Sequence, residues 1–506
     1  MRRAKIEPAG WVAVFCCALL VLTSLAGCSH APRPAASGDP LTAEQVRACS
    51  DFFSTLDKVV QGSNARDAGE FRIEGYPYLR VNRFLASFRD DLTDDHRFNA
   101  WLARLKNLDR RARHFEIANS SAAERDALQA RSEGANLDHQ VVFCGDLLAS
   151  VQLATPANRA RLLQAARAPD EYSSIKRVAG LYPLPLLFIA DGVEKWQRSA
   201  REKFSTEASS QPHLQCYVPP VTHSSVTNPA AIAQEVERDA VGVPLYSPQQ
   251  ELALFNLYAP VWEVEHRGDF DQIGAPAWDD RGRLWIDTRR PTAYELLSYT
   301  RFNGKVLTQL NYIVWFPSRP KKGPLDLLGG RLDGVNYRVT LDADGQPLLY
   351  ETVHNCGCYL AFYPTPRLTP RAVTGCVEPP LLLPAPRLNA AVERMVISLA
   401  SGDHQVRRLY PLSTATVGSD RIYAAADYDD LRSLPLDKSG AQKRSMFADN
   451  GLVAGTERLE RWLLWPAGVA SPGAMRQWGR HALAFMGERH LDDPYLLQEL
   501  FEAARH

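Results

Sequence analysis

The residues best suited to chemistry form one short run, His354-Asn355-Cys356-Gly357-Cys358. In a β-strand, residues i, i+2 and i+4 point to the same face, so an extended backbone would align the imidazole of His354 with two sulfur atoms. Imidazole and thiolate are ligands that suit zinc or copper. The run therefore predicts a candidate metal site at His354, Cys356 and Cys358, with a fourth ligand from Cys376, Cys216 or His213.

The two cysteines of this run have other interpretations. Each can form a disulfide with a distant cysteine, for example Cys216 and Cys376, as cysteines in oxidising compartments commonly do. A direct Cys356–Cys358 bond needs a bend at Gly357, because residues i and i+2 of an extended strand lie too far apart. A redox pair is the third interpretation, although the familiar redox spacing has two residues between the cysteines.

A second group is an acidic cluster around one histidine, which comprises Glu263, Glu265, His266, Asp269 and Asp271, with Asp279 and Asp280 close behind. Paired carboxylates beside a histidine can perform acid–base catalysis or hold a hard cation. The cluster is therefore our candidate for a hydrolase site. The alternative is a solvated strand face whose aspartates occupy turns.

Motifs of several large enzyme classes are absent from the sequence. It contains no Gly-x-Ser-x-Gly elbow, no His-Glu-x-x-His pair and no phosphate loop that ends in Gly-Lys-Ser or Gly-Lys-Thr. These absences remove support for the common serine hydrolases, zinc proteases and nucleotide enzymes of those types.

The start of the chain indicates the compartment in which these residues work. Arg2, Arg3 and Lys5 form a basic beginning, no charge occurs from Ala9 to Gly27, and small residues precede Cys28. A basic end, an apolar stretch and a small-residue exit are typical of a secretory signal peptide. The alternative is an uncleaved membrane anchor, because the uncharged stretch approaches the roughly 20 residues that span a bilayer.

The tetrad Leu25-Ala26-Gly27-Cys28 resembles the lipobox of bacterial lipoproteins and matches it at every position. This resemblance covers residues 1–29 only. It implies that Cys28 receives a diacylglyceryl group, that residues 1–27 are removed, and that the new N-terminus is acylated, for example with palmitate. Ser29 implies export to the outer membrane, since aspartate at that position retains such lipoproteins in the inner membrane. The folded part would then lie in the periplasm or at the cell surface.

Composition limits the class of partner. The full chain has 506 residues and a formal net charge of zero, and loss of residues 1–27, with three basic residues and one acidic residue, leaves −2. A near-neutral chain lacks the basic footprint of a nucleic-acid binder, so we exclude nucleic acid as a partner. The membrane, reached through the lipid, remains the one partner that the sequence predicts.

Cysteine usage agrees with export. Without the signal peptide and Cys28, six cysteines remain, an even number that predicts disulfides in an oxidising compartment. Cys49 and Cys144 each lie on the apolar face of a predicted helix, so we expect a Cys49–Cys144 bond. The alternative is two buried free thiols, because free cysteine packs as a small hydrophobic residue.

The pattern predicts an α+β protein with an N-terminal helical part. After the signal peptide (1–27) and a lipidated tether (28–41), we expect an α-helical domain over 42–210. A capping box at Thr42–Gln45 would open its first helix. The run Leu181–Ala190 is interpreted as a buried helix start, with a surface that dips into the membrane as the alternative. Helical spacing predicts the further helices 78–92, 94–115, 121–132, 137–153 and 156–168.

A β-rich domain is expected over 211–440, as an antiparallel sandwich or open barrel. Its strongest signals are hairpin turns at Asp279–Gly282, Asn303–Gly304 and Asp342–Gly345, with a further hairpin from Met395 to Tyr410. The end of the chain, 441–506, returns to a helical pattern in which Glu457–Leu464, Ala474–Met486 and Pro494–Arg505 are the clearest parts.

Three functions remain open at this level. The first is a non-enzymatic envelope lipoprotein that binds or scaffolds another component at the outer membrane. The second is a tethered envelope hydrolase that uses Glu263, Glu265, His266 and Asp269. The third is a metal or redox protein that uses His354, Cys356 and Cys358. The absence of catalytic motifs favours the first.

Overall fold

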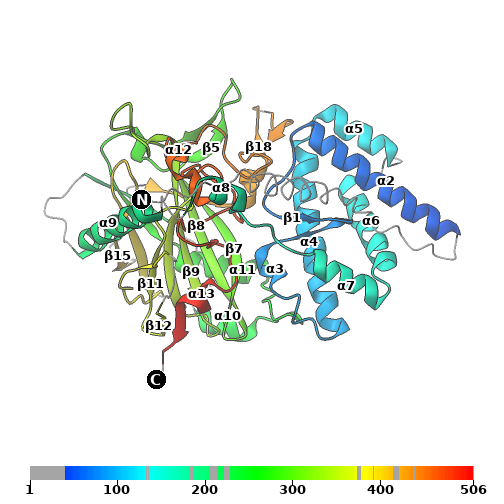
Figure 1. Cartoon of the computed structure of the whole chain (residues 1–506), viewed down its shortest axis with the longest axis horizontal. Helices are drawn as coiled ribbons and strands as arrows, with labels where there is room; N and C mark the ends of the chain where they lie inside the picture. The colour runs from blue at the N-terminus through cyan, green and yellow to red at the C-terminus, as the bar shows by residue number, and fades with distance from the viewer. Residues whose placement is uncertain are drawn as a thin grey trace, which may run out of the picture.

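The structure is a computed structural model that describes residues 40–504, except for 133, 135, 183–185, 206–212, 221–227, 373–377, 391, 414–420 and 438. The fold is a mixed α+β arrangement, with an N-terminal helical region followed by a strand-rich region, as the sequence predicts. Figure 1 shows the helical region beside the sheets, with α4 between them and the outer helices. Cys28 and Cys376 lie outside the described residues.

The helical domain, which we define as residues 40–205, follows the predicted helices closely over most of its length. Ser121 and Glu124 form a capping box at α5, and Thr155 caps α7 ahead of Pro156. The first helix begins at Pro40, two residues before the expected start. The helices are α2 (Pro40–Gly62), α3 (Arg83–Ala86), α4 (Asp95–Asn119), α5 (Ala122–Arg131), α6 (Leu137–Gln152), α7 (Pro156–Ala165), α8 (Ser174–Ala179) and α9 (Leu186–Ser205).

The helix predicted over 78–92 is wrong. A hairpin of β1 (Phe71–Ile73) and β2 (Tyr76–Val81) occupies its first part, and only the short α3 follows. Gly75 supplies the positive φ of the turn, and Pro77 is disfavoured inside a helix because it has no N–H. The hairpin packs on α4, so an aromatic and β-branched segment becomes the inner layer of the helical domain.

The largest sheet has seven strands in the order β13-β11-β10-β9-β8-β7-β17. The predicted turn Asn303–Gly304 joins β7 to β8, with both residues at positive φ, and Asp342–Gly345 joins β9 to β10. Its inner neighbours are antiparallel, whereas the two outermost pairs are parallel. The strands are β7 (Thr292–Phe302), β8 (Lys305–Arg319), β9 (Gly330–Leu341), β10 (Pro347–His354), β11 (Ala361–Pro364), β13 (Leu381–Leu382) and β17 (Ala424–Asp427).

A second sheet of five strands packs against the first. Its order is β15-β14-β4-β3-β16, and β14–β15 is the predicted hairpin after Met395. Trp262 and Ile397 from this sheet meet Tyr312 and Tyr337 from the larger sheet in one buried core. This arrangement is the predicted sandwich. The strands are β3 (Leu214–Val218), β4 (Val261–Glu265), β14 (Glu393–Leu399), β15 (Val406–Ser413) and β16 (Arg421–Ile422).

Smaller elements complete the β-rich domain, which we define as residues 213–504. The turn Asp279–Gly282 joins β5 (Ala275–Trp278) to β6 (Leu284–Asp287), as predicted. The others are α10 (Pro229–Glu235), α11 (Pro248–Tyr258), η1 (Asp269–Asp271), β12 (Leu368–Pro370), η2 (Tyr428–Arg432), β18 (Leu434–Pro435), β19 (Lys443–Arg444), α12 (Arg461–Leu464), η3 (Trp465–Ala467), α13 (Leu496–Leu500) and β20 (Phe501–Ala503).

The C-terminal segment is less helical than predicted. Ala474–Met486 is not a helix, because Gly473, Gly479 and Gly487 adopt positive φ and turn the chain instead. The predicted helices around it shorten to α12 and α13. The intervening residues run over the larger sheet, where Arg476 donates to the carbonyl of Cys356. Met475 packs with side chains of the larger sheet, and Leu483 packs with the sheet and with α13.

A helix, α9, does begin within the run Leu181–Ala190, and Ile189 in its first turn is buried. Residues 183–185 lie outside the described residues. Leu181 lies before α9 and Phe188 lies in its first turn, and both side chains are exposed. Further along α9, Trp196 and Phe204 pack on the β-rich core. No helix among the described residues combines the length and hydrophobicity required to cross a bilayer.

Candidate functional site

The acidic cluster does not converge on a cavity. Glu263 and Glu265 share one face of β4, but Glu263 accepts from Tyr410 and Glu265 pairs with Arg267. Asp269 is exposed in η1, and His266 faces the ring of His213 at 5.9 Å. Of the described cavities reported below, none is lined by these residues. The four predicted catalytic residues therefore have different contacts and do not meet at one site. They are Glu263, Glu265, His266 and Asp269.

Asp271 does not contact the rest of the acidic cluster through its carboxylate. It belongs to a buried row of acids and imidazoles that was not predicted from the sequence. His404 Nε2 lies 3.5 Å from Asp271 Oδ1, and its Nδ1 lies 2.9 Å from Asp333 Oδ2. The other oxygen of Asp333 lies 3.4 Å from His354 Nδ1. Four groups from η1, β9, the end of β10 and the β14–β15 turn thus form a row of alternating acids and imidazoles.

The electrostatics of this row favour a fixed charge on His404. Burial alone would lower its pKa, but hydrogen bonds to Asp271 and Asp333 raise the pKa to about 8. Burial opposes the charge of Asp333 as well, yet His354 and His404 hold the pKa of that carboxyl well below its usual range. The ring of His404 also stacks on Phe316 at 3.9 Å. The ion pairs of His404 with Asp271 and Asp333 therefore hold η1, β9 and the β14–β15 turn together.

His354 lies at one end of this row. Its Nδ1 faces Asp333, and its Nε2 has no hydrogen-bond partner among the described residues. The ring lines a cavity of about 20 Å³ under α9, with Trp196, Thr352 and Tyr359. Such a volume admits about one water molecule, so it is too small for a substrate.

The row of three ligands predicted from His354 to Cys358 does not form, because β10 ends at His354. Gly357 adopts φ +91°, and the N–H of His354 donates to the carbonyl of Cys358 across the resulting turn. Cys356 and Cys358 carry free thiols, with the Cys358 N–H 3.4 Å from Cys356 Sγ. No group of three histidine, cysteine or acidic side chains in the described part of the chain is arranged to hold a metal.

The thiol of Cys358 is poorly activated. The hydrogen bond from Cys356, together with burial, raises the pKa of Cys358 well above its usual value. A thiolate is the nucleophile and the metal ligand, so a raised pKa opposes both roles. Cys216 lies in β3 opposite Glu263, on the smaller sheet, and the predicted partner Cys376 is outside the described residues.

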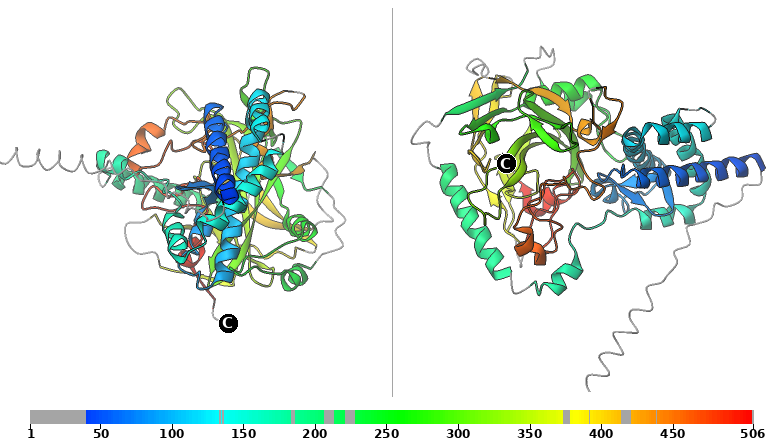
Figure 2. Two further views of the ribbon diagram at one scale, coloured as in Figure 1. Left: turned by 90° about the vertical axis from the view of Figure 1, so that its right-hand side faces the viewer. Right: turned by 90° about the horizontal axis from the view of Figure 1, so that it is seen from above.

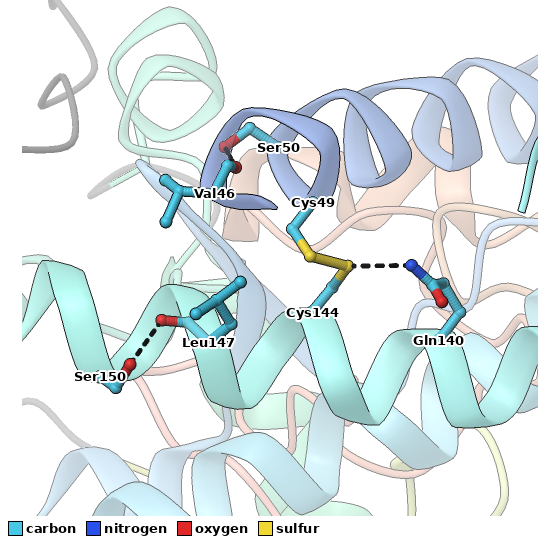
Figure 3. The surroundings of a disulfide bond; sticks show 7 residues. All are labelled: Val46, Cys49, Ser50, Gln140, Cys144, Leu147 and Ser150. Carbon is cyan, nitrogen blue, oxygen red and sulfur yellow. Dashed lines mark hydrogen bonds between the residues drawn. A yellow bond between two sulfur atoms is a disulfide. The ribbon is translucent and has the colours of Figure 1, made fainter. Parts of the chain in front are cut away.

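The predicted Cys49–Cys144 disulfide is present. It joins α2 to α6 with 5.0 Å between the Cα atoms, as Figure 3 shows. Gln140, one turn earlier in α6, donates to the sulfur of Cys144. The bond fastens α2 to α6, which packs on β2.

A cavity among the described residues lies between the two domains, and we call it the interdomain cleft. Its volume is about 430 Å³, within the usual range of ligand sites. Figure 1 shows α3 and α4 facing β7 across this region. The helical domain contributes chiefly Glu70, Asn82, Phe84, Arg104, Asn107, Leu108, Arg110 and Arg111. The β-rich domain contributes Leu296–Tyr299, Tyr428, Asp429, Arg432, Gln477–Gly479 and Asp492.

The buried wall of the cleft carries an acceptor without a donor. Gln477 is almost fully buried, and its Nε2 donates to Asp67 Oδ2 at 3.3 Å. A carboxylate accepts only, so this bond fixes the orientation of the amide. Gln477 Oε1 then has no hydrogen-bond partner among the described residues. Leaving a buried acceptor unpaired costs about 1–3 kcal/mol. This oxygen is closed to solvent, so a donor group of a ligand reaches it only if the wall of the cleft shifts.

Charged groups surround this acceptor. Arg432 pairs with Asp67, Glu70 and Asp429. Burial raises the pKa of Glu70, which Arg432 only partly offsets. Arg111 pairs with Asp429 and keeps about half of its side chain exposed. The cleft therefore combines an exposed guanidinium, a buried amide oxygen and the aromatic side chains Phe84, Tyr299 and Trp478.

No family model matches this chain, and comparison with the curated proteins and with the solved structures gave no match either. The geometry described above therefore carries the functional argument.

Sequence reasoning missed every part of the cleft. Arg111, Arg432 and Gln477 come from three distant segments, and none belongs to a motif. Each has an ordinary meaning where it stands, since arginine and glutamine are common on helix and loop surfaces. Only the packing of the two domains brings them together.

Proposed function

We propose that the protein is a lipid-anchored lipoprotein of the bacterial outer membrane that binds a polar ligand in its interdomain cleft. The lipobox at Leu25–Cys28 supports the anchor. The observation that carries the binding role is the cavity of about 430 Å³ between the two domains, which Arg111 and Gln477 line. Pockets of this size with a few convergent polar groups are typical ligand sites.

The residues of the cleft favour a ligand with both hydrogen-bond donors and an anionic group. Hydroxyl or amide N–H groups would satisfy Gln477 Oε1, and a carboxylate would compete with Asp429 for Arg111. The aromatic side chains supply apolar contact area. Soluble fragments of the cell-wall polymer carry sugar hydroxyls, amides and carboxylates, and they occur in the proposed compartment.

A binding role suits the titratable groups better than a hydrolytic one. Asp271, Asp333 and His404 bond to one another, and Glu263 and Glu265 have their own partners. A general acid or base must reach a proton of the substrate. In the described part of the chain, the buried row of acids and imidazoles does not border the cleft.

The experiment is a titration of the mature protein with purified cell-wall fragments, followed by tryptophan fluorescence, because Trp478 lines the cleft. We expect saturable binding, and Arg111→Gln should weaken it about tenfold or more, the value of one charge-assisted hydrogen bond. Arg161→Gln, an exposed change on α7 outside the cleft, should bind as the unaltered protein does. Absence of saturable binding, or equal binding by Arg111→Gln, would contradict the proposal.

A further inference from the structure

An apolar patch lies on the surface formed by α8, α12 and the first turn of α9. Six large apolar side chains are exposed by 60% or more there. They are Ile175 (81%), Val178 (77%), Leu181 (63%), Phe188 (83%), Trp462 (66%) and Leu463 (60%). Single exposed apolar side chains are normal, but a group of this size marks an interaction surface.

The two halves of the patch are held together by specific contacts. The N–H of Ser173, which caps α8, donates to the carbonyl of Gly468, and Arg177 Nε donates to the carbonyl of Ala467. Gly180, at the end of α8, packs so closely on Pro466 that a Cβ there would lie 2.6 Å from it. The helix α8 therefore lies directly against η3, the continuation of α12.

Phe188 belongs to the same surface. Only residues 183–185 separate Tyr182 from the start of α9, so the chain between them spans at most about 14 Å. Figure 2 shows α8, α9 and α12 on one side of the molecule in both views, with α10 and α11 on the opposite side. The helices that carry the patch therefore lie on one side of the molecule.

The chemistry of this face is that of a membrane interface. Trp462 is exposed, and the guanidinium of Arg461 lies 4.9 Å from its ring centroid. Lys176 lies in α8 beside Ile175. Tryptophan at the headgroup level with lysine and arginine beside it is characteristic of surfaces that meet a bilayer. Such a surface buries its apolar side chains in the interface and leaves the basic ends among headgroups.

The segment between Cys28 and Pro40 is the reason for choosing a bilayer as the partner of the patch. This step rests on the proposed function. If Cys28 is lipidated, twelve residues, 28–39, connect the lipid to Pro40, so the folded part starts within about 43 Å of the headgroups. Attachment to the bilayer gives the patch a high effective concentration of that surface. A weak interfacial contact then suffices to orient the protein.

We infer that this apolar patch inserts into the interface of the membrane that carries the lipid anchor. The lipid and the patch form two attachment points, which together fix the orientation of the protein on the bilayer. The side that carries α10 and α11 then faces away from the membrane (Figure 2).

The test uses the chain from Ser29, without lipid, in flotation with vesicles of phosphatidylethanolamine and phosphatidylglycerol. Every contact described above lies within residues 40–504, so this chain retains all of them. We expect it to float with the vesicles and the double variant Trp462→Glu, Leu463→Glu to lose at least tenfold in bound fraction. Leu252→Glu, on the exposed side of α11, should bind as the unaltered chain does.

Three results would overturn the inference. They are a chain from Ser29 that does not float, a double variant that floats equally well, and a dimer in solution that the double variant abolishes. Circular dichroism of the double variant checks that it is folded, and Ile175→Glu with Val178→Glu, a second pair on α8, must give the same loss. Lipidation of Cys28 is measured separately, so failure of the anchor and failure of the patch are distinguishable.

Discussion

Arg432 Nε lies 2.8 Å from Asp67 Oδ2, and this buried pair joins the two domains across 365 residues of sequence. The same guanidinium contacts Glu70 and Asp429 at 3.0 Å. Asp67 also binds Gln477, and its N–H donates to Glu116, the buried partner of Arg80. One arginine therefore holds the wall of the interdomain cleft to the charged core of the helical domain.

We expect Arg432→Met to lower the free energy of unfolding by about 3–5 kcal/mol. The change leaves Asp67 and Glu70 without their cation, whereas Asp429 keeps Arg111, and an uncompensated buried charge is strongly destabilising. Urea unfolding followed by circular dichroism measures the loss. Arg161→Met, on an exposed part of α7, should change stability by less than about 0.5 kcal/mol. Equal stability of the two variants would show that Arg432 does not hold the domains together.

The Cys49–Cys144 bond should stabilise the helical domain strongly. It closes a loop of 95 residues, for which chain entropy predicts about 4.7 kcal/mol. The double variant Cys49→Ala, Cys144→Ala should therefore unfold at lower urea concentration. Addition of a reductant should destabilise the unaltered protein and leave the double variant unchanged. Peptide mapping without reduction that finds both thiols free would disprove the bond.

Glu295 should make stability fall between acidic and neutral pH. It pairs across the sheet with Asp427, and burial, with Glu251 and Asp427, raises its pKa to about 7. A raised pKa gives stability that is present below pH 4.5 and lost as pH rises through 7. Glu295→Gln should therefore gain about 2–3 kcal/mol over the unaltered protein at pH 8 and nothing at pH 4.5.

Urea unfolding at several pH values measures this difference. Glu235→Gln, at the exposed end of α10, is the control and should show no such pH dependence. A constant difference for Glu295→Gln at every pH would mean that its carboxyl titrates normally.

His404 should give a second pH dependence above neutrality. Its pKa is raised to about 8, so its ion pairs stabilise the protein fully below pH 6.5 and are lost as pH rises through 8. His404→Gln should therefore cost about 2 kcal/mol more at pH 6 than at pH 9. Thermal or urea unfolding at both pH values checks this. The same cost at both would show that folding does not raise the pKa of His404.

Local signals in the sequence predicted much of the fold. Asn303–Gly304 specified a hairpin because only a few residue types accept two positive φ values in succession. Thr155–Pro156 specified a helix start through a cap and a ring-fixed φ. In both cases the structure depends on neighbours in sequence. The hairpin at residues 71–81 escaped prediction because an apolar run of that length fits either a helix or a strand.

The site depended on contacts that no local pattern encodes. Asp333 and His404 lie on different sheets, and their 2.9 Å contact exists only because those sheets pack together. His354 belonged to a predicted row of ligands, but the turn at Gly357 directed Cys356 and Cys358 elsewhere. The Cys49–Cys144 contact could be predicted because each cysteine lies on the apolar face of a clear helix.

The central claim is that the chain is a lipoprotein attached through Cys28, and mass spectrometry of the N-terminal peptide tests it most directly. Cys28 itself lies outside the described residues. Protein extracted from the membranes of its own cells should give a first peptide that begins at Cys28 and carries a diacylglyceryl group and an N-acyl chain. A peptide that retains residues 1–27, or one that begins elsewhere with an unmodified Cys28, would contradict the claim.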